Sequence, residues 1–148
     1  MEEPNGGAMS RSPATHAQSR PRPLSPHLTV YRPKITMTMS IVHRITGGAL
    51  YFGTLLVALW LIAAAGSRDT FDTVNWFFGT LIGRLILFGY TWALMQHMLG
   101  GIRHFIWDTG AALDKHTASK LGWATLFGSI VLTVAIWIVG YMVRGGWA

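Results

Sequence analysis

The chain has 148 residues, of which 51% are hydrophobic and only 12% are charged, and its formal net charge at pH 7 is +6. Soluble domains carry about 25% charged residues, so this composition is typical of a one-domain membrane protein and disfavours a water-soluble fold. There is no cysteine, which excludes a disulfide framework, a thiolate nucleophile, a CxxCH haem attachment and cysteine ligation of an iron–sulfur cluster.

The amino-terminal region is rich in proline, serine and glycine and has no apolar core of a secretory signal. Residues 1–20 are predicted to form a disordered cytoplasmic tail, because they offer few apolar side chains to bury. A mitochondrial presequence is disfavoured by Glu2, Glu3 and the prolines. Residues 21–40 are predicted to be a docking segment that leads into the first helix, since the prolines and Tyr31 favour extended, partner-binding structure.

Three apolar runs can cross a membrane as helices, at about residues 41–65, 76–107 and 121–143. A spanning helix needs about 20 residues for a hydrocarbon core about 30 Å thick. The second run is longer than that, so its spanning part is placed at residues 85–106, with Arg84 at one interface and Arg103 as an anchor at the other. The predicted fold is therefore all-α, with a transmembrane domain over residues 41–143 and a short tail at 144–148.

The basic residues predict the orientation of these helices. Only Arg68 and Arg144 clearly lie on the outer side. Nine of the twelve lysines and arginines share the other side, namely Arg11, Arg20, Arg22, Arg32, Lys34, Arg44, Arg103, Lys115 and Lys120. The positive-inside rule therefore places the amino terminus and the second loop in the cytoplasm. This asymmetry explains the net charge without a nucleic-acid partner, and no nucleic-acid-binding module is recognisable.

The first helix begins with a polar group in "TMSIVHRITGG". Ser40, His43, Arg44 and Gly47 are spaced i, i+3, i+4 and i+7, so they share one face near the cytoplasmic end. A hydroxyl and a guanidinium can hydrogen-bond a carbonyl oxygen and stabilise negative charge on it as it is reduced, while the imidazole passes protons. The alternative is structural, with Ser40 as the helix cap and Arg44 at the lipid phosphates.

The second helix ends in "HMLGGIRHFIWD", where His97 and His104 are seven residues apart and share a face. Without cysteine, a redox centre here must be held by histidine, which limits the candidates to b-type haem or a histidine-rich metal site. Gly100 and Gly101 would leave room for a macrocycle beside an axial histidine. They fit close helix packing equally well, with the histidines hydrogen-bonding across it.

Depth in the membrane distinguishes the two histidines. His97 is predicted to lie about 14 Å deep, where an ionisable group is a functional candidate by default. It is therefore the better iron ligand. His104 lies near the surface and suits a polar group at the haem edge, such as a propionate.

Two segments carry a family resemblance. "RPLSPHLTVYRPKITMTMSIVHRIT", at residues 22–46, and "HMLGGIRHFIWDTG", at residues 97–110, resemble the signature regions of the succinate dehydrogenase cytochrome b556 subunit, a family of membrane anchors. The resemblance implies a bundle of three transmembrane helices that is completed by a second small membrane-anchor subunit.

The resemblance also implies roles for residues at the matching positions. His97 matches the axial ligand of a single haem b, whose other ligand is supplied by the second anchor subunit. Ser40, Arg44 and Asp108 match quinone-binding positions. His43, Arg44 and His104 match positions near the haem propionates.

The implied function is that of one part of succinate:quinone oxidoreductase, respiratory complex II, which is not an enzyme alone. Flavoprotein and iron–sulfur subunits would oxidise succinate, and electrons would pass to ubiquinone at a site shaped partly by this chain. The absence of a convincing presequence favours the bacterial inner membrane as the location, with the mitochondrial inner membrane as the alternative. Two rival interpretations are a non-redox structural anchor or transporter component, and a dihaem cytochrome b.

Overall fold

The computed structural model describes residues 32–145, so the expectations for residues 1–20 and for most of the docking segment at 21–40 lie outside the described residues. Within this range the chain forms four α-helices and no strand: α1 (Ile35–Ala65), α2 (Arg68–Gly79), α3 (Leu81–Asp108) and α4 (Lys115–Val143). Three of them, α1, α3 and α4, are long and apolar enough to cross a membrane. The all-α membrane fold is thereby confirmed.

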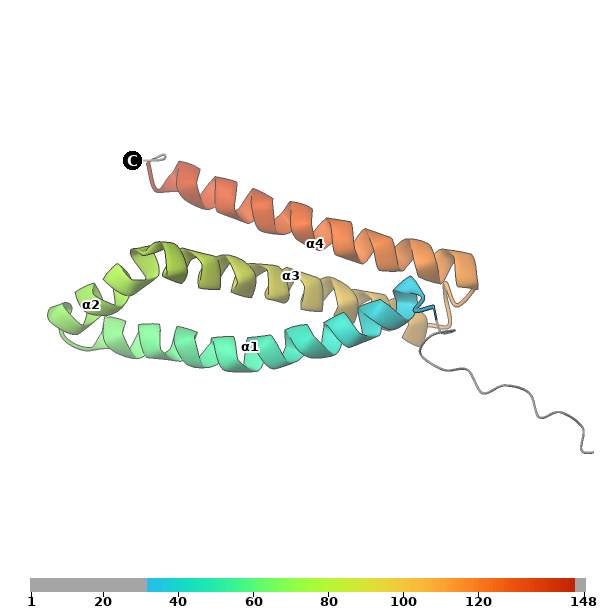
Figure 1. Ribbon diagram of the computed structural model, residues 1–148, viewed down its shortest axis with the longest axis horizontal. Coiled ribbons are helices and arrows are strands. Elements are labelled where there is room, and N and C mark those ends of the chain that lie inside the picture. The colour runs from blue at the N-terminus through green and yellow to red at the C-terminus, as the bar shows by residue number, and fades with distance from the viewer. Residues whose placement is uncertain (1–31, 146–148) are drawn as a thin grey trace, which may run out of the picture. The chain divides into compact units, whose positions relative to one another are not determined.

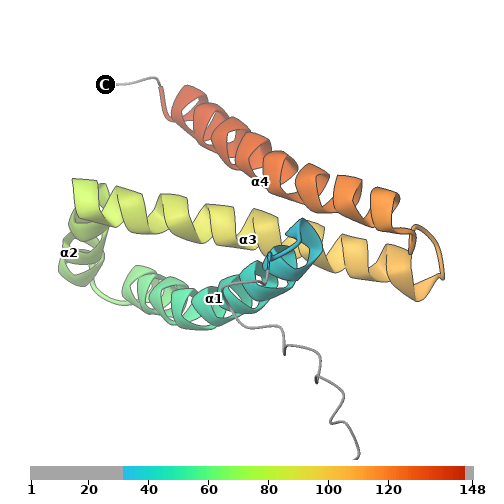
Figure 2. The same ribbon diagram turned by 45° about the vertical axis from the view of Figure 1, so that its right-hand side comes forward.

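The three long helices run side by side with alternating direction, and the short α2 joins α1 to α3 (Figure 1). We call the end where α1 begins, α3 ends and α4 begins the basic end, because Lys34, Lys115 and Lys120 lie there. The other end, with α2 and the end of α4, is the opposite end. The α4 helix lies close to α3 at the basic end and diverges from it toward the opposite end (Figure 2).

The single helix expected over residues 76–107 is instead two helices that meet at Thr80. Its backbone is extended, with φ −67° and ψ 163°, and its hydroxyl accepts a hydrogen bond from the Gly83 backbone N–H at 3.1 Å. Thr80 thereby ends α2 and caps α3. A Cβ at Gly83 would collide with the backbone of Phe77 and Phe78, so the close turn between the helices requires glycine there. The apolar sequence continues on both sides of this break, which is why hydropathy alone predicts one helix.

The first helix begins earlier than the apolar run that predicted it. It starts at Ile35 rather than at residue 41, and Lys34 precedes it without a side-chain cap. Ser40 is therefore inside the first two turns of α1 and does not cap the helix. The structural interpretation of Ser40 as a cap is wrong, and its hydroxyl is left for another role.

Polar rather than large apolar side chains fill the contacts between the helices. Thr125, Ser129 and Thr133 follow one stripe of α4 and are all buried. Each hydroxyl donates to a backbone carbonyl of its own helix, which satisfies it without water. Small side chains of this kind allow close helix packing in lipid. Large apolar side chains such as Ile82 and Val131 point outward instead, as expected for surfaces that meet lipid or other subunits.

The start of α4 depends on a charged cap. The Asp114 carboxylate accepts a hydrogen bond from the Thr117 backbone N–H at 2.8 Å. This bond, helped by the Thr117 side chain, holds the pKa of Asp114 below its usual value. A depressed pKa means that the cap stabilises the fold above the unfolded-state pKa, about 3.9, and that this stabilisation is lost as the pH falls through the lower folded-state value.

Replacing Asp114 with alanine is therefore expected to lower the thermal unfolding midpoint of the assembled protein at pH 7, with a shrinking difference from wild type below about pH 4. Asp114→Asn should keep most of the stability, because asparagine is also a good cap. Asp72→Ala, on exposed α2, is the control. An unchanged midpoint for Asp114→Ala at pH 7 would contradict the capping role.

Candidate functional site

Three histidines from two helices gather in the half of the bundle nearer the basic end. The rings of His43 on α1 and His97 on α3 are stacked, with centroids 4.0 Å apart and an interplanar angle of 4°. The ring of His104, two turns further along α3, lies 5.2 Å from that of His43 at a tilt of 55°. The two α3 histidines, which are spaced i and i+7, thus form one cluster with the histidine on α1.

The His97 ring is oriented by a backbone carbonyl. Its Nδ1 lies 3.1 Å from the His43 backbone oxygen and 3.3 Å from the Thr46 hydroxyl. That hydroxyl itself donates to the carbonyls of Val42 and His43, at 2.9 and 3.0 Å, so its oxygen is left to accept. Both neighbours of Nδ1 are therefore acceptors, which places the proton on Nδ1. The lone pair of His97 is then on Nε2, the state that a metal-ligating histidine needs.

The Nδ1 atom of His43 is buried and has no hydrogen-bond partner within residues 32–145. His104 packs edge-on against Trp107, with ring centroids 5.3 Å apart.

Two glycines make room for these rings, but not in the way that the sequence suggested. A Cβ at Gly47 would lie 3.0 Å from His97 Cε1, and one at Gly100 would lie 2.5 Å from His43 Nδ1. The space beside Gly100 is therefore taken by His43 and is not free for a macrocycle. Gly101 does face open space, with nothing within 4 Å of its would-be Cβ. Of the glycine pair, only Gly101 borders open space, and the clearance expected at Gly100 is absent.

The expected quinone residues lie at the basic end of the bundle. Ser40 and Arg44 are one turn apart on α1, so their side chains share a face. Arg44 is exposed and Ser40 half-buried, and neither side chain forms a hydrogen bond or ion pair with another residue in the described range. Asp108 is the exposed last residue of α3, and no hydrogen bond or ion pair joins it to either. The structure thus brings Ser40 and Arg44 together and leaves Asp108 separate.

Arg103 is not the exposed interfacial anchor that was expected. Only 2% of it is exposed, and its guanidinium lies over the Trp107 ring at 5.0 Å. Its Nε and Nη1 atoms are buried and unpartnered within residues 32–145. Like Gln96, whose amide approaches the Met39 sulfur at 3.6 Å, it belongs to the buried stripe of α3. No carboxylate in the described range accompanies this positive charge, so the site favours anions.

Sequence reasoning missed Thr46, Gln96 and Arg103 as parts of this region. Thr46 follows His43 by three residues and so shares its face, which is a signal that could have been used. Gln96 and Arg103 are also seven residues apart, and each directly precedes one histidine of the pair His97 and His104. Among residues 32–145 no group of three or more histidine, cysteine or acidic side chains could hold a metal ion, so a histidine-rich metal site has no support there.

Comparison with known proteins identifies the family of the chain. Residues 18–136 match the family model described as succinate dehydrogenase/fumarate reductase transmembrane subunit. The chain is 43% identical over 121 residues to the succinate dehydrogenase cytochrome b556 subunit of Paracoccus denitrificans, covering 82% of this chain and 93% of that protein. It is 35% identical over 117 residues to the cytochrome b556 subunit of Rickettsia conorii, covering 79% and 91%. It is also 35% identical over 117 residues to the mitochondrial cytochrome b560 subunit of Sus scrofa, covering 78% and 69%.

Proposed function

Because the chain belongs to the family of succinate dehydrogenase/fumarate reductase transmembrane subunits, we propose that it anchors complex II in the membrane, holds one side of a haem b and forms part of the ubiquinone site. It is a multi-pass membrane protein and one subunit of an enzyme complex, without activity of its own. The proposed partners are a flavoprotein subunit, an iron–sulfur subunit and a second small membrane-anchor subunit.

The observation that carries the haem assignment is the hydrogen bond of His97 Nδ1 to the His43 backbone oxygen, at 3.1 Å. This bond leaves the Nε2 lone pair for iron, and a backbone acceptor on the other ring nitrogen is the usual support of a metal-ligating histidine. His97 would hold the haem iron from this chain, and the second anchor subunit would supply a further ligand. A single haem shared in this way fits the fact that, in the described range, His97 alone has this arrangement.

The haem propionates are proposed to lie against the cationic side of the cluster. His43 would donate a hydrogen bond from its imidazole, and His104 and Arg44 lie toward the basic end of the bundle. The buried charge of Arg103 strengthens the attraction for an anion, because the low-polarity interior screens it little. The haem, when bound, supplies reversible uptake of single electrons.

The quinone is proposed to bind at the basic end, between this chain and the iron–sulfur subunit. The Ser40 hydroxyl and the Arg44 guanidinium donate hydrogen bonds to one carbonyl oxygen and stabilise the negative charge that develops as that oxygen is reduced. His43 lies one turn from Ser40 on the same face and can pass a proton to the quinone oxygen. Asp108, at the same end, is a further quinone-site candidate without a direct contact to these residues.

The proposed location is the bacterial inner membrane, with the basic end and the amino terminus in the cytoplasm. The basic side chains at that end support this orientation through the positive-inside rule. In this arrangement electrons enter from the cytoplasmic subunits, next to Ser40 and Arg44. His97, which would hold the haem, lies deeper, 11 residues before the end of α3 at Asp108.

The direct test is to purify the intact complex and record its reduced-minus-oxidised absorption spectrum together with its succinate-driven quinone reduction. We expect a b-type spectrum with one haem per complex. A colourless but fully assembled complex would support a structural anchor or transporter component instead. Two haems per complex would support a dihaem cytochrome.

Gly47 offers a sharper test of the His97 pocket. Replacing Gly47 with alanine is expected to displace the His97 ring, because the new Cβ would lie 3.0 Å from Cε1. We expect haem retention during purification to fall by roughly tenfold, as for other supporting residues of metal sites. Gly48→Ala is the matched control, since nothing lies within 4 Å of a Cβ there. Equal haem contents in the two variants would show that His97 is not held where the haem requires it.

A further inference from the structure

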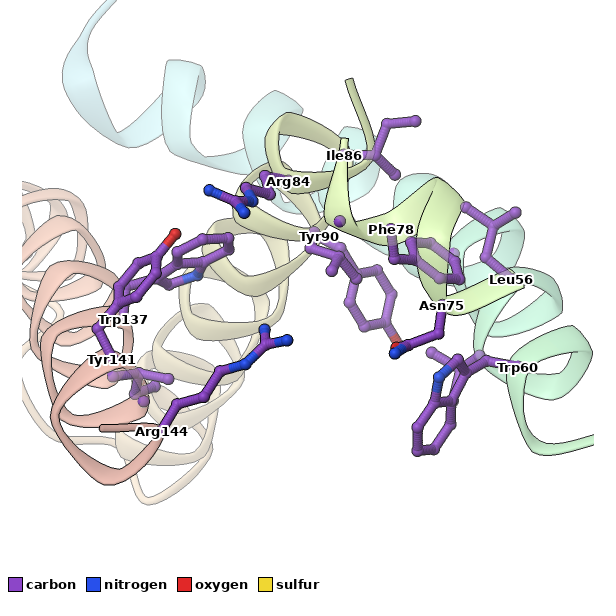
Figure 3. Close-up of a pocket in the computed structure, with 16 residues that line it drawn as sticks. Leu56, Trp60, Asn75, Phe78, Arg84, Ile86, Tyr90, Trp137, Tyr141 and Arg144 are labelled. Carbon is purple, nitrogen blue, oxygen red and sulfur yellow. The ribbon is translucent and has the colours of Figure 1, made fainter. Parts of the chain in front are cut away.

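A cavity separate from the histidine cluster lies toward the opposite end of the bundle, where α4 diverges from α3. It has a volume of about 530 Å³ and is lined by all four helices (Figure 3). Its walls are mostly apolar and aromatic, with Trp60 on α1, Phe78 on α2, Tyr90 on α3 and Trp137 on α4. We call it the outer groove.

The charged side chains that line the outer groove are all positive. Arg84 and Arg144 both line it, whereas no carboxylate does. Neither guanidinium forms an ion pair or hydrogen bond with any residue in the range 32–145. Figure 3 shows both arginines on the α3 and α4 side of the groove, opposite Trp60 and Asn75.

The positions of the arginines place them at the depth of the membrane interface. Arg84 lies in the first turn of α3, and Arg144 is the residue that ends α4. The groove then continues inward to Tyr90, six residues beyond Arg84 or about 9 Å along the axis of α3. It therefore combines two cations at the membrane surface with an apolar channel that runs into the hydrocarbon core.

This combination matches one class of ligand. We propose that the outer groove binds a phospholipid with a negatively charged headgroup, taken from the adjacent leaflet. Its phosphate pairs with Arg84 and Arg144, since guanidinium groups bind phosphate oxygens in bidentate fashion. One acyl chain fills the aromatic channel.

An anionic lipid matches the charge and the apolar lining of the outer groove better than a partner helix or a quinone does. A helix of another subunit would cover both arginines and would need to bring its own carboxylates to pair with them. A neutral quinone would leave both charges without a partner. An anionic phospholipid supplies the negative charge and the apolar chain in one molecule, and both are present at this depth in the membrane.

The test uses the complete complex, purified with its haem and all of its subunits. Native mass spectrometry measures the phospholipid that it retains, and the thermal midpoint is compared after adding mixed micelles with phosphatidylglycerol or phosphatidylcholine. The variants are the pair Arg84→Gln with Arg144→Gln, and Gly140→Leu. The leucine fills the outer groove without removing charge, because Gly140 lines it and nothing lies within 4 Å of a Cβ there. Arg68→Gln is the control, an exposed arginine on α2 outside the lining.

For wild type and Arg68→Gln we expect retained anionic lipid and a larger rise of the midpoint with phosphatidylglycerol than with phosphatidylcholine. For the double arginine variant and for Gly140→Leu we expect lipid retention to fall by roughly tenfold, with an unchanged haem spectrum. Equal effects of the two lipids on wild type would overturn the proposal, as would lipid retention by both variants. Loss of the second anchor subunit from the variants, instead of loss of lipid, would show that a partner helix occupies the groove.

Discussion

Replacing Arg44 with alanine is expected to lower succinate-driven quinone reduction by roughly a hundredfold, the lower end of the range found when a charge-stabilising donor is removed from an active site. The side chain is exposed at the basic end, beside Ser40, and is not engaged by any described residue. Its charge therefore remains available to the substrate. Oxidation of succinate by a soluble artificial acceptor should be unchanged, because that reaction does not use the membrane subunits.

The Arg44 variant needs two comparisons. Arg44→Lys keeps the charge but loses the planar fork of donors, so an intermediate rate is expected if directional hydrogen bonding to the quinone oxygen matters. Lys120→Ala removes an exposed cation from the same end, on α4, and should leave the rate unchanged. A full rate for Arg44→Ala, with the complex assembled, would remove Arg44 from the quinone site.

The sequence predicts the class of fold and the number of spanning helices well, because long apolar runs leave few alternatives in lipid. It predicts the ends of those helices less well. The break at Thr80 lies between two apolar segments, so hydropathy does not detect it. The break is marked only by the Thr80 cap, whose hydroxyl forms a single hydrogen bond with the Gly83 backbone N–H.

In the candidate site, too, residue spacing predicts which side chains share a helix face but not the contacts between helices. The i, i+7 spacing of His97 and His104 predicts a shared face, and the structure brings that face to His43 on another helix. The tautomer of His97 could not be predicted, since it depends on a carbonyl of α1 that is distant in sequence. The prediction that Arg103 is an exposed anchor at the membrane interface is wrong for a similar reason. It was based on the position of Arg103 along one helix, whereas packing between helices buries the side chain.

Replacing His97 with alanine is expected to abolish the b-type haem spectrum. The variant removes the only ring whose Nδ1 is held by a backbone carbonyl and whose Nε2 is left for iron, among residues 32–145. His116→Ala is the control, because His116 is exposed near the start of α4. If His97→Ala kept a normal spectrum, the axial assignment would be wrong.

Loss of haem from an alanine variant can also follow from poor assembly, so the most direct measurement restores the ligand instead of only removing it. His97→Gly leaves a space in which free imidazole can take the place of the side chain. We predict that the assembled His97→Gly complex lacks the b-type reduced-minus-oxidised spectrum and regains it when haem and imidazole are added together, but not with haem alone. A native spectrum in His97→Gly without imidazole would contradict the claim that His97 ligates the haem iron.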